Sequence, residues 1–552
     1  MTAANQETGL ERRFPLWPVV NTLLAALSAA LLTLSLPPFG TPWLVWIALI
    51  PAYCICRQDG VKRSLPFLCL AGVAFFVCAT GWVGRFHALA VPFVAVLYGL
   101  LTFAVPMWLS GFVLRRQPAL GVVAAPAFWV AFEYLRSSWP LRFPFGVLGT
   151  TQFHWPRLIQ FVDVTGVWGV SFLIVLVNAT LFRLGAWLLA RAPRSALRAS
   201  LVPAIVTVAL LSAALGYGTA RIRADGRDRA GTLTIALVQT RSTAGSSADA
   251  LESILDEGGA FFRIARTYRP DLIVLPENWL KGEVTIDPVL RDERSVRALG
   301  AVSRHAAGVD ASVLFGALGS RTYGEEIRHY NMAYLFSRSG DLTGAYRKRV
   351  LVPFGEYYPF GRLFPRLRQD LLETSGARYL DPGTDAPVMD VAAADGRVHG
   401  FGVLICFESA LGYLARDYAR RGARFLVNIT DDYWSRSPAA MSQHAVLSVF
   451  RAVENRVPVV RAANGGVTCF VSSTGHLYAS IPPLAPGVLA STVRLHDEPV
   501  GTIYTRWGDW LPWLCAVFAA VAMTWSLCPA NARQRPPEQL LQSQADILAS
   551  GR

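Results

Sequence analysis

Charged residues are scarce in this 552-residue chain. Asp, Glu, Lys and Arg together make up 16% of it, against about 25% in an ordinary soluble domain. Hydrophobic residues make up 53%. This composition excludes a disordered chain and a wholly soluble protein.

The net charge of +14 is unevenly distributed. Residues 219 to 509 are nearly balanced, and most of the excess positive charge lies in the hydrophobic parts of the chain. Membrane-flanking loops have this pattern, whereas a nucleic-acid-binding domain carries a basic face on its folded surface. The charge therefore indicates a membrane, and no nucleic acid, as the partner.

Cysteines and cofactor motifs are also few. The eight cysteines are scattered, and six lie in or beside apolar stretches, which excludes a disulfide framework. Cys54 and Cys56 lack the spacing and the partner ligands of a zinc site. The chain has no glycine-rich phosphate loop, no Gly-x-Ser-x-Gly and no His-Glu-x-x-His. We therefore expect no metal and no cofactor.

Long apolar runs are abundant instead. A helix needs about 20 residues to cross a bilayer. The runs lie near Leu16 to Leu36, Leu44 to Cys56, Leu65 to Val83, Val91 to Leu114, Leu120 to Leu135, Gly166 to Leu189, Leu201 to Gly218 and Trp510 to Leu527. We predict eight transmembrane helices, of which the second and fifth are short. The first has no clear cleavage site after it, so we expect it to be retained.

This pattern divides the chain into four parts. We predict a membrane domain over 1–218, an outer domain over 219–509, an eighth helix over 510–528 and a tail over 529–552. One set of alternate loops carries Arg12, Arg13, Arg57, Lys62, Arg63, Arg115, Arg116, Arg191, Arg194, Arg198, Arg533 and Arg535, and the opposite set is poorer in positive charge. By the positive-inside rule, both termini are cytoplasmic and the outer domain is on the other side.

The outer domain alternates strand-like and helical segments, so we predict one α/β unit of mixed sheet with helices on its faces. The strand candidates are Leu233 to Val238, Leu272 to Leu275, Ser312 to Ala317, Met332 to Phe336, His399 to Cys406, Phe425 to Ile429, Pro458 to Ala462 and Val467 to Ser472. The helix candidates are Ala248 to Arg266, Asp292 to His305, Leu411 to Arg421 and Met441 to Asn455.

Three segments of this domain end an apolar strand with a reactive side chain. They place Glu277, Lys348 and Cys406 after their strands. A thiolate is the working nucleophile of a cysteine, and Glu277 is a candidate for the base that takes its proton. Lys348 and the Phe407 backbone N–H are candidates to stabilise the thiolate and a tetrahedral oxyanion.

Each of these residues also has a structural interpretation. Glu277 is suited to cap a helix after Pro276, and Cys406 to fill a buried strand position. Lys348 is flanked by two arginines, which favours a solvated basic run. However, the chain has only three lysines, and a lysine provides a compact donor close to an oxyanion.

The order Glu, Lys, Cys in these settings resembles the nitrilase superfamily of carbon-nitrogen hydrolases, whose domain is an α-β-β-α sandwich. The flanking helices, Tyr346-x-Lys348 followed by Leu351-Val-Pro-Phe-Gly-Glu-Tyr357, and Tyr504-Thr-Arg-Trp-Gly-Asp-Trp510 resemble the apolipoprotein N-acyltransferases of bacterial inner membranes. The resemblance implies a triad of Glu277, Lys348 and Cys406, with Glu356 and Glu408 in support.

Further segments also follow this family's pattern, and we expect them to be mainly scaffold. They are Asn428 to Trp434, Gln443-His444, Arg451 to Arg456 and Arg461 to Gly465. The aromatic residues Phe354, Tyr357, Tyr358 and Phe360 are too irregularly spaced for a helix stripe. They are suited to form a lid in the headgroup zone, although core packing explains them equally well.

The expected activity is a two-stage acyl transfer on the outer face of the inner membrane. Cys406 takes an acyl chain from a phospholipid, which the resemblance implies is usually phosphatidylethanolamine, to form a thioester. The α-amine of a diacylglyceryl-modified N-terminal cysteine of a lipoprotein then takes the chain.

Two other classes stay open. One is a membrane-tethered amidase or nitrilase that passes the acyl group to water. The other is a transporter or receptor with an inert outer domain, for which we expect several intramembrane charges. The apolar runs hold few, chiefly Glu133 and Arg183.

Overall fold

The computed structural model describes residues 16–528, except 59–60, 86–87, 89, 139–141, 190–193, 226–228, 242–258, 358–365, 367–379, 497 and 499. Among these residues, seven helical stretches are long and apolar enough to cross a membrane. They are Trp17–Ser35, Arg63–Arg85, Ala90–Arg116, Pro118–Ser138, Trp168–Leu189, Ser200–Asp225 and Trp510–Leu527. The chain is therefore a multi-pass membrane protein with seven candidate spans.

The predicted count of eight spans is not confirmed. The second predicted span falls in the shorter apolar stretch Pro42–Arg57. This stretch consists of η1 (Pro42–Trp46) and α2 (Ile50–Gln58), separated by a turn at Ile47 to Leu49. Even as one continuous helix it would extend only about 24 Å, which is less than the roughly 30 Å of a bilayer core.

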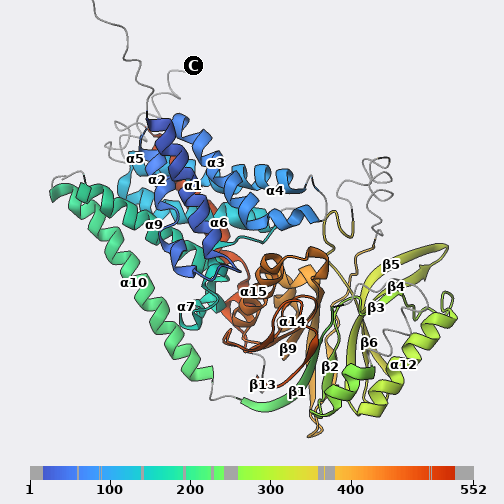
Figure 1. Cartoon of the computed structure of the whole chain (residues 1–552). Coiled ribbons are helices and arrows are strands. Elements are labelled where there is room, and N and C mark those ends of the chain that lie inside the picture. Colours follow the sequence, from blue (N-terminus) through green and yellow to red (C-terminus); the bar gives the residue numbers. More distant parts are fainter. Residues whose placement is uncertain are drawn as a thin grey trace, which may run out of the picture.

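The helical bundle and the α/β part lie side by side, and the spans form the bundle (Figure 1). Its main helices are α1 (Trp17–Ser35), α3 (Val61–Thr80), α4 (Ala90–Gly99), α5 (Val105–Arg116), α6 (Pro118–Ser138), α9 (Trp168–Leu189), α10 (Arg194–Asp225) and α17 (Trp510–Leu527). Helix α10 runs along one side and leads into the first strand, and α17 returns to the bundle after the last strand.

The α/β part contains two sheets, so the prediction of one mixed sheet is wrong. The first has the order β13-β1-β2-β4-β5-β6, with β3 paired to β4, and the second has the order β12-β11-β10-β9-β8-β7. The strands are β1 (Arg229–Gln239), β2 (Leu272–Val274), β3 (Leu280–Glu283), β4 (Ser312–Tyr323), β5 (Glu326–Phe336), β6 (Leu342–Arg347), β7 (Met389–Ala392), β8 (Val398–Ile405), β9 (Phe425–Asp431), β10 (Val459–Asn464), β11 (Thr468–Val471), β12 (Leu477–Ile481) and β13 (Gly487–His496).

Alternating side chains divide the first sheet between two cores. Leu233, Ile235 and Leu237 of β1 lie in the core between the sheets, whereas Ala236 and Val238 lie in a second core with helix α12 (Glu293–Val309). Helices α14 (Gly412–Arg420) and α15 (Pro438–Asn455) cover the second sheet. The layers are therefore helix, sheet, sheet and helix, as the resemblance implied.

The α15 side of the sandwich is fastened to the bundle by hydrogen bonds. The Gln443 side chain accepts from Trp82 Nε1 at 3.3 Å and donates to the carbonyl oxygens of Pro37 and Ala79. Arg456 pairs with Asp163 at 2.7 Å. All the Gln443 partners lie in the bundle, so the second sheet and the loops at its strand ends have a fixed position relative to the membrane helices.

Candidate active site

The structure brings the predicted Glu277, Lys348 and Cys406 together. Each follows a strand: Glu277 comes three residues after β2, Lys348 directly after β6, and Cys406 directly after β8. Two of these strands belong to the first sheet and one to the second. The site therefore lies between the two sheets and needs both of them to form.

Glu277 is buried among hydrogen-bond donors. Its Oε1 accepts from Asn331 Nδ2 at 2.6 Å and from Lys348 Nζ at 3.5 Å, and its Oε2 accepts from the Asp431 N–H at 2.7 Å. The backbone lies tightly against Gly316 of β4, where a Cβ atom would be 2.6 Å from Glu277 Cα. Burial raises the pKa of the Glu277 carboxyl, and the Lys348 charge opposes part of that rise.

Lys348 is 1% exposed and lies between two carboxylates. Its Nζ donates to Glu356 Oε1 at 2.8 Å and to Glu277 Oε1 at 3.5 Å. Burial alone would lower the pKa of Lys348, but the charges of Glu356 and Glu277 outweigh it and hold the pKa above its ordinary value. Lys348 is therefore an ammonium ion, which is the form that stabilises an oxyanion.

Cys406 stands at the sharp turn from β8 into the short helix η5 (Cys406–Ala410). Its φ of 52° is in the left-handed region, which residues other than glycine seldom adopt. Burial, followed by the Glu277 charge, raises the pKa of the Cys406 thiol well above its ordinary value. The thiol therefore keeps its proton at rest, and attack requires a base that removes the proton.

A hydrogen-bonded network lies behind this turn. His444 Nε2 is 3.1 Å from the Cys406 carbonyl oxygen, and His444 Nδ1 is 2.8 Å from Asp432 Oδ1. Arg461 pairs with the other Asp432 oxygen at 2.6 Å. All of these side chains are buried. The network connects the backbone of Cys406 to β9 and β10.

The two supporting carboxylates have different surroundings. Glu356 contacts Lys348 and accepts the Val352 N–H at 2.8 Å. Glu408 is fully buried and accepts hydrogen bonds from separate segments of the chain. Its oxygens accept from Tyr346 OH, from the N–H groups of Arg349 and Val350, and from the Ile405 N–H. Glu408 thus fastens the end of β8 to the loop that follows Lys348.

Asn331 is a site residue that was not predicted from the sequence. Its Nδ2 on β5 donates to Glu277 Oε1 at 2.6 Å and to Glu356 Oε1 at 2.9 Å. The available signal was a lone amide in the apolar run from Tyr330 to Phe336. An amide there tolerates burial only with hydrogen-bond partners.

The aromatic segment after Leu351 is partly described. Phe354 is 41% exposed, and its ring centroid is 6.3 Å from that of Phe93 on α4. The Phe354 N–H donates to the Tyr357 carbonyl oxygen at 2.8 Å. Tyr358 and Phe360 lie outside the described residues. The lid therefore stays a prediction.

Two family models match the chain. Residues 28–180 match the apolipoprotein N-acyltransferase N-terminal domain, and residues 234–498 match the carbon-nitrogen hydrolase domain. Among solved structures, an amidase from Nesterenkonia sp. has 20% identity and a TM-score of 0.35, covering 50% of this chain and 94% of that chain.

Curated relatives match over nearly the full length. The apolipoprotein N-acyltransferase of Geobacter metallireducens is 32% identical over 526 residues, which is 91% of this chain and 95% of that protein. Apolipoprotein N-acyltransferase 1 of Treponema pallidum is 31% identical, over 93% and 95% of the two chains. With both domains matched in order and this extent of similarity, the chain belongs to the apolipoprotein N-acyltransferase family and is an acyltransferase.

Proposed function

We propose that Glu277, Lys348 and Cys406 are the catalytic triad of this acyltransferase. The observation that supports this most directly is the buried pair of Glu277 and Lys348, 3.5 Å apart, which both act electrostatically on the Cys406 thiol. The family implies a phospholipid as acyl donor and a lipoprotein as acceptor. Each residue then has a role in two acyl-transfer steps.

In the first step, Cys406 Sγ attacks the carbonyl carbon of a phospholipid ester. Glu277 takes the thiol proton as the carbon–sulfur bond forms, because the raised thiol pKa disfavours a free thiolate. Lys348 and the Phe407 N–H stabilise the oxyanion, since the first N–H groups of a helix have no acceptor within it. The ester carbon–oxygen bond then breaks, and the lysophospholipid oxygen receives the proton from Glu277.

In the second step, the acceptor amine attacks the thioester. Glu277 accepts the amine proton, the carbon–sulfur bond breaks, and the sulfur of Cys406 leaves and regains a proton. An amine is a stronger nucleophile than water, and a site from which water is excluded favours amide formation over hydrolysis. The products are an N-acylated lipoprotein and the free enzyme.

Aromatic side chains from the bundle border the site and support delivery from the membrane. Phe93 contacts Phe354, the Trp82 ring is 6.1 Å from Trp434, and Phe145 is 6.4 Å from Phe407. Phe354 and Tyr357, together with Tyr358 and Phe360 outside the described residues, form the proposed lid. Glu356 orients Lys348, with which it is paired at 2.8 Å.

The proposed acyl donor, acceptor and cellular location are those predicted from the sequence. We propose phosphatidylethanolamine as the usual donor and the α-amine of an N-terminal diacylglyceryl-cysteine as the acceptor. The bacterial inner membrane is the proposed location, with both termini cytoplasmic and the domain over 219–509 periplasmic. The loop charges support this orientation.

Mass spectrometry of the purified protein with phospholipid alone tests the mechanism. A fatty acyl adduct is expected on Cys406, and it should persist until a diacylglyceryl lipopeptide is added. The adduct should be absent in Cys406→Ala and present in Cys469→Ala, a matched change at a buried cysteine on β11. An adduct at another residue would contradict the triad, and release of free fatty acid without N-acylated peptide would favour a hydrolase.

A further inference from the structure

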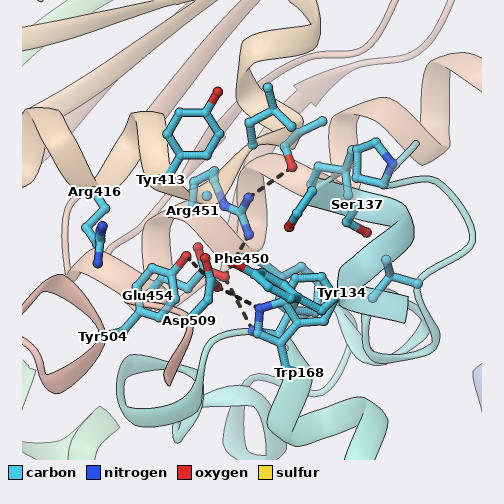
Figure 2. A pocket seen from close by; sticks show the side chains of 18 of the residues that line it. Tyr134, Ser137, Trp168, Tyr413, Arg416, Phe450, Arg451, Glu454, Tyr504 and Asp509 are labelled. Atoms are coloured by element: carbon cyan, nitrogen blue, oxygen red, sulfur yellow. Dashed lines mark hydrogen bonds and ion pairs between the residues drawn. The ribbon is translucent and has the colours of Figure 1, made fainter. Parts of the chain in front are cut away.

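A cavity of about 360 Å³ lies between the helical bundle and the sandwich (Figure 2). Its walls come from the ends of α6, α9 and α17 and from α14, α15 and α16 (Ile503–Trp507). Small-ligand sites begin at about 300 Å³, so its size suits a small polar group. The described residues that line it do not include Glu277, Lys348 or Cys406.

Positively charged groups outnumber negatively charged ones in the walls. Arg142, Arg416 and Arg451 line the cavity together with the carboxylates of Glu454 and Asp509. Figure 2 shows Arg451 close to Glu454, with Arg416 at the other side of the acidic pair. The ion pair between Arg451 and Glu454 is 2.7 Å long, and these residues are 4% and 1% exposed.

The arginines keep unused hydrogen-bonding capacity. Arg451 Nε is buried and has no partner within the described part of the chain. Arg416 forms no hydrogen bond or ion pair with any residue that the structure describes, and packs against the backbone of Gly508. Arg451 is buried, so its unpaired donor carries a desolvation cost, whereas Arg416 is only partly buried. These two groups therefore favour a ligand that brings acceptor oxygens.

The two carboxylates differ in their surroundings: Asp509 is held by neighbours, whereas Glu454 Oε2 is buried without a partner within the described part of the chain. Asp509 Oδ1 accepts from Trp168 Nε1 at 2.7 Å and from Tyr504 OH at 3.3 Å. Burial raises the pKa of Glu454 to about 7, so its negative charge is incomplete near neutrality. The net preference of the cavity is consequently for an anion.

The rim of the cavity carries exposed aromatic and apolar side chains. Trp507 and Trp513 line the cavity and are 73% and 65% exposed, and Leu514 and Val517 of the same span are also exposed. Tryptophan is enriched where a membrane meets water. A ligand that enters here comes from the bilayer, with apolar chains that can lie along α17.

We propose that this cavity binds the phosphate headgroup of a phospholipid other than the one being cleaved. Arg416 and Arg451 donate to its phosphate oxygens, for which the planar guanidinium is well suited. Ala410, the last residue of η5, lines the cavity, and η5 begins at Cys406. Bound lipid therefore stabilises the segment that carries the nucleophile. This role rests on the proposed function, in which Cys406 is the nucleophile and a phospholipid is the acyl donor.

Native mass spectrometry and thermal unfolding of the full-length protein in detergent test this site. The variant is Arg416→Ala, and the matched control is Arg420→Ala, an exposed arginine on the same helix. We expect Arg416→Ala to retain one phospholipid fewer and to bind added phospholipid about tenfold more weakly, the loss of one charge-assisted hydrogen bond. Arg416→Ala should keep the wild-type KM for the acyl donor. The control Arg420→Ala should retain and bind phospholipid as the wild type does.

Three results would overturn the proposal. The first is wild-type lipid retention in Arg416→Ala. The second is a rise of the KM for the donor in proportion to the loss of lipid binding, which would make the cavity the donor site itself. The third is stabilisation by inorganic phosphate equal to that by phospholipid. Should Arg416→Ala fail to fold, Arg416→Gln keeps most of the packing and removes only the charge. Full lipid binding by Arg416→Gln would be equally decisive against the proposal.

Discussion

His444 Nε2 lies 3.1 Å from the carbonyl oxygen of Cys406, and this contact ties the backbone of the proposed nucleophile to a buried ion pair. The same ring reaches Asp432 at 2.8 Å, and Asp432 in turn is paired with Arg461. A left-handed residue that is not glycine costs roughly 1–2 kcal/mol. The ring thus helps to hold Cys406 at its left-handed φ of 52°.

We predict that His444→Ala slows thioester formation by about 10- to 100-fold, because small misplacements of a reacting atom have effects of this size. KM for the donor should change little. The rate of Cys406 alkylation by iodoacetamide should change together with acylation, which a purely stabilising role would not produce. His476→Ala, at an exposed histidine, is the control. Unaltered alkylation with slow acylation would remove the positioning role.

Asn331 connects the two carboxylates that flank Lys348, because its amide group donates to both Glu277 and Glu356 and carries no charge itself. Asn331→Asp would place a third carboxylate there and raise the pKa of Glu277 further. We expect the acidic limb of the pH–rate profile to move to higher pH in Asn331→Asp and to move much less in Asn331→Leu, which adds no charge. Identical profiles for the two variants would show that charge at this position is unimportant.

We expect Glu408 to contribute mainly to the free energy of unfolding and not directly to the reaction. Glu408→Ala removes a buried acceptor of several hydrogen bonds and leaves the Ile405 N–H without its partner. We expect the free energy of unfolding to fall by about 3 kcal/mol. Glu326→Ala, on the exposed end of β5, should change it by less than about 0.5 kcal/mol. Chemical unfolding in detergent measures both, and a stable but inactive Glu408→Ala would instead indicate a direct catalytic role.

Much of the proposed catalytic centre was predictable because Glu277 and Cys406 each follow a short apolar run, which favours a buried strand. All the predicted strands overlap observed ones. The missed strands β3, β7, β12 and β13 are short or partly exposed, so their apolar pattern is weak. Strand β13 also depends for pairing on β1, about 250 residues away in sequence.

The relations between distant segments were not predictable from local patterns. Asn331 meets Glu277 only because β5 and β2 belong to one sheet, and Glu408 meets Tyr346 only across the two sheets. The separation into two sheets and the break between η1 and α2 also depend on packing. The order of Glu277, Lys348 and Cys406 along the chain indicated the proposed site, whereas the hydrogen-bond partners of these residues required the fold.

The pH dependence of acylation follows from the directions of the pKa shifts. Burial raises the pKa of Glu277, and the base must be ionised to take the thiol proton, so the rate should fall on acidification at a pH above the ordinary carboxyl value of about 4.5. The pKa of Lys348 is also raised, so the ammonium persists and loss of its proton should produce no alkaline limb below about pH 10.

Glu277→Gln isolates the base. Without a carboxylate, only a thiolate formed in advance can attack, and the thiol pKa remains above its ordinary value because burial is its main cause. We expect the rate at neutral pH to fall by about 10²- to 10⁴-fold and the residual rate to rise with pH, where the wild-type rate is flat. Glu283→Gln, at a partly exposed carboxylate on β3, serves as the control and should keep the wild-type profile. A residual rate that does not depend on pH would show that some other group removes the thiol proton.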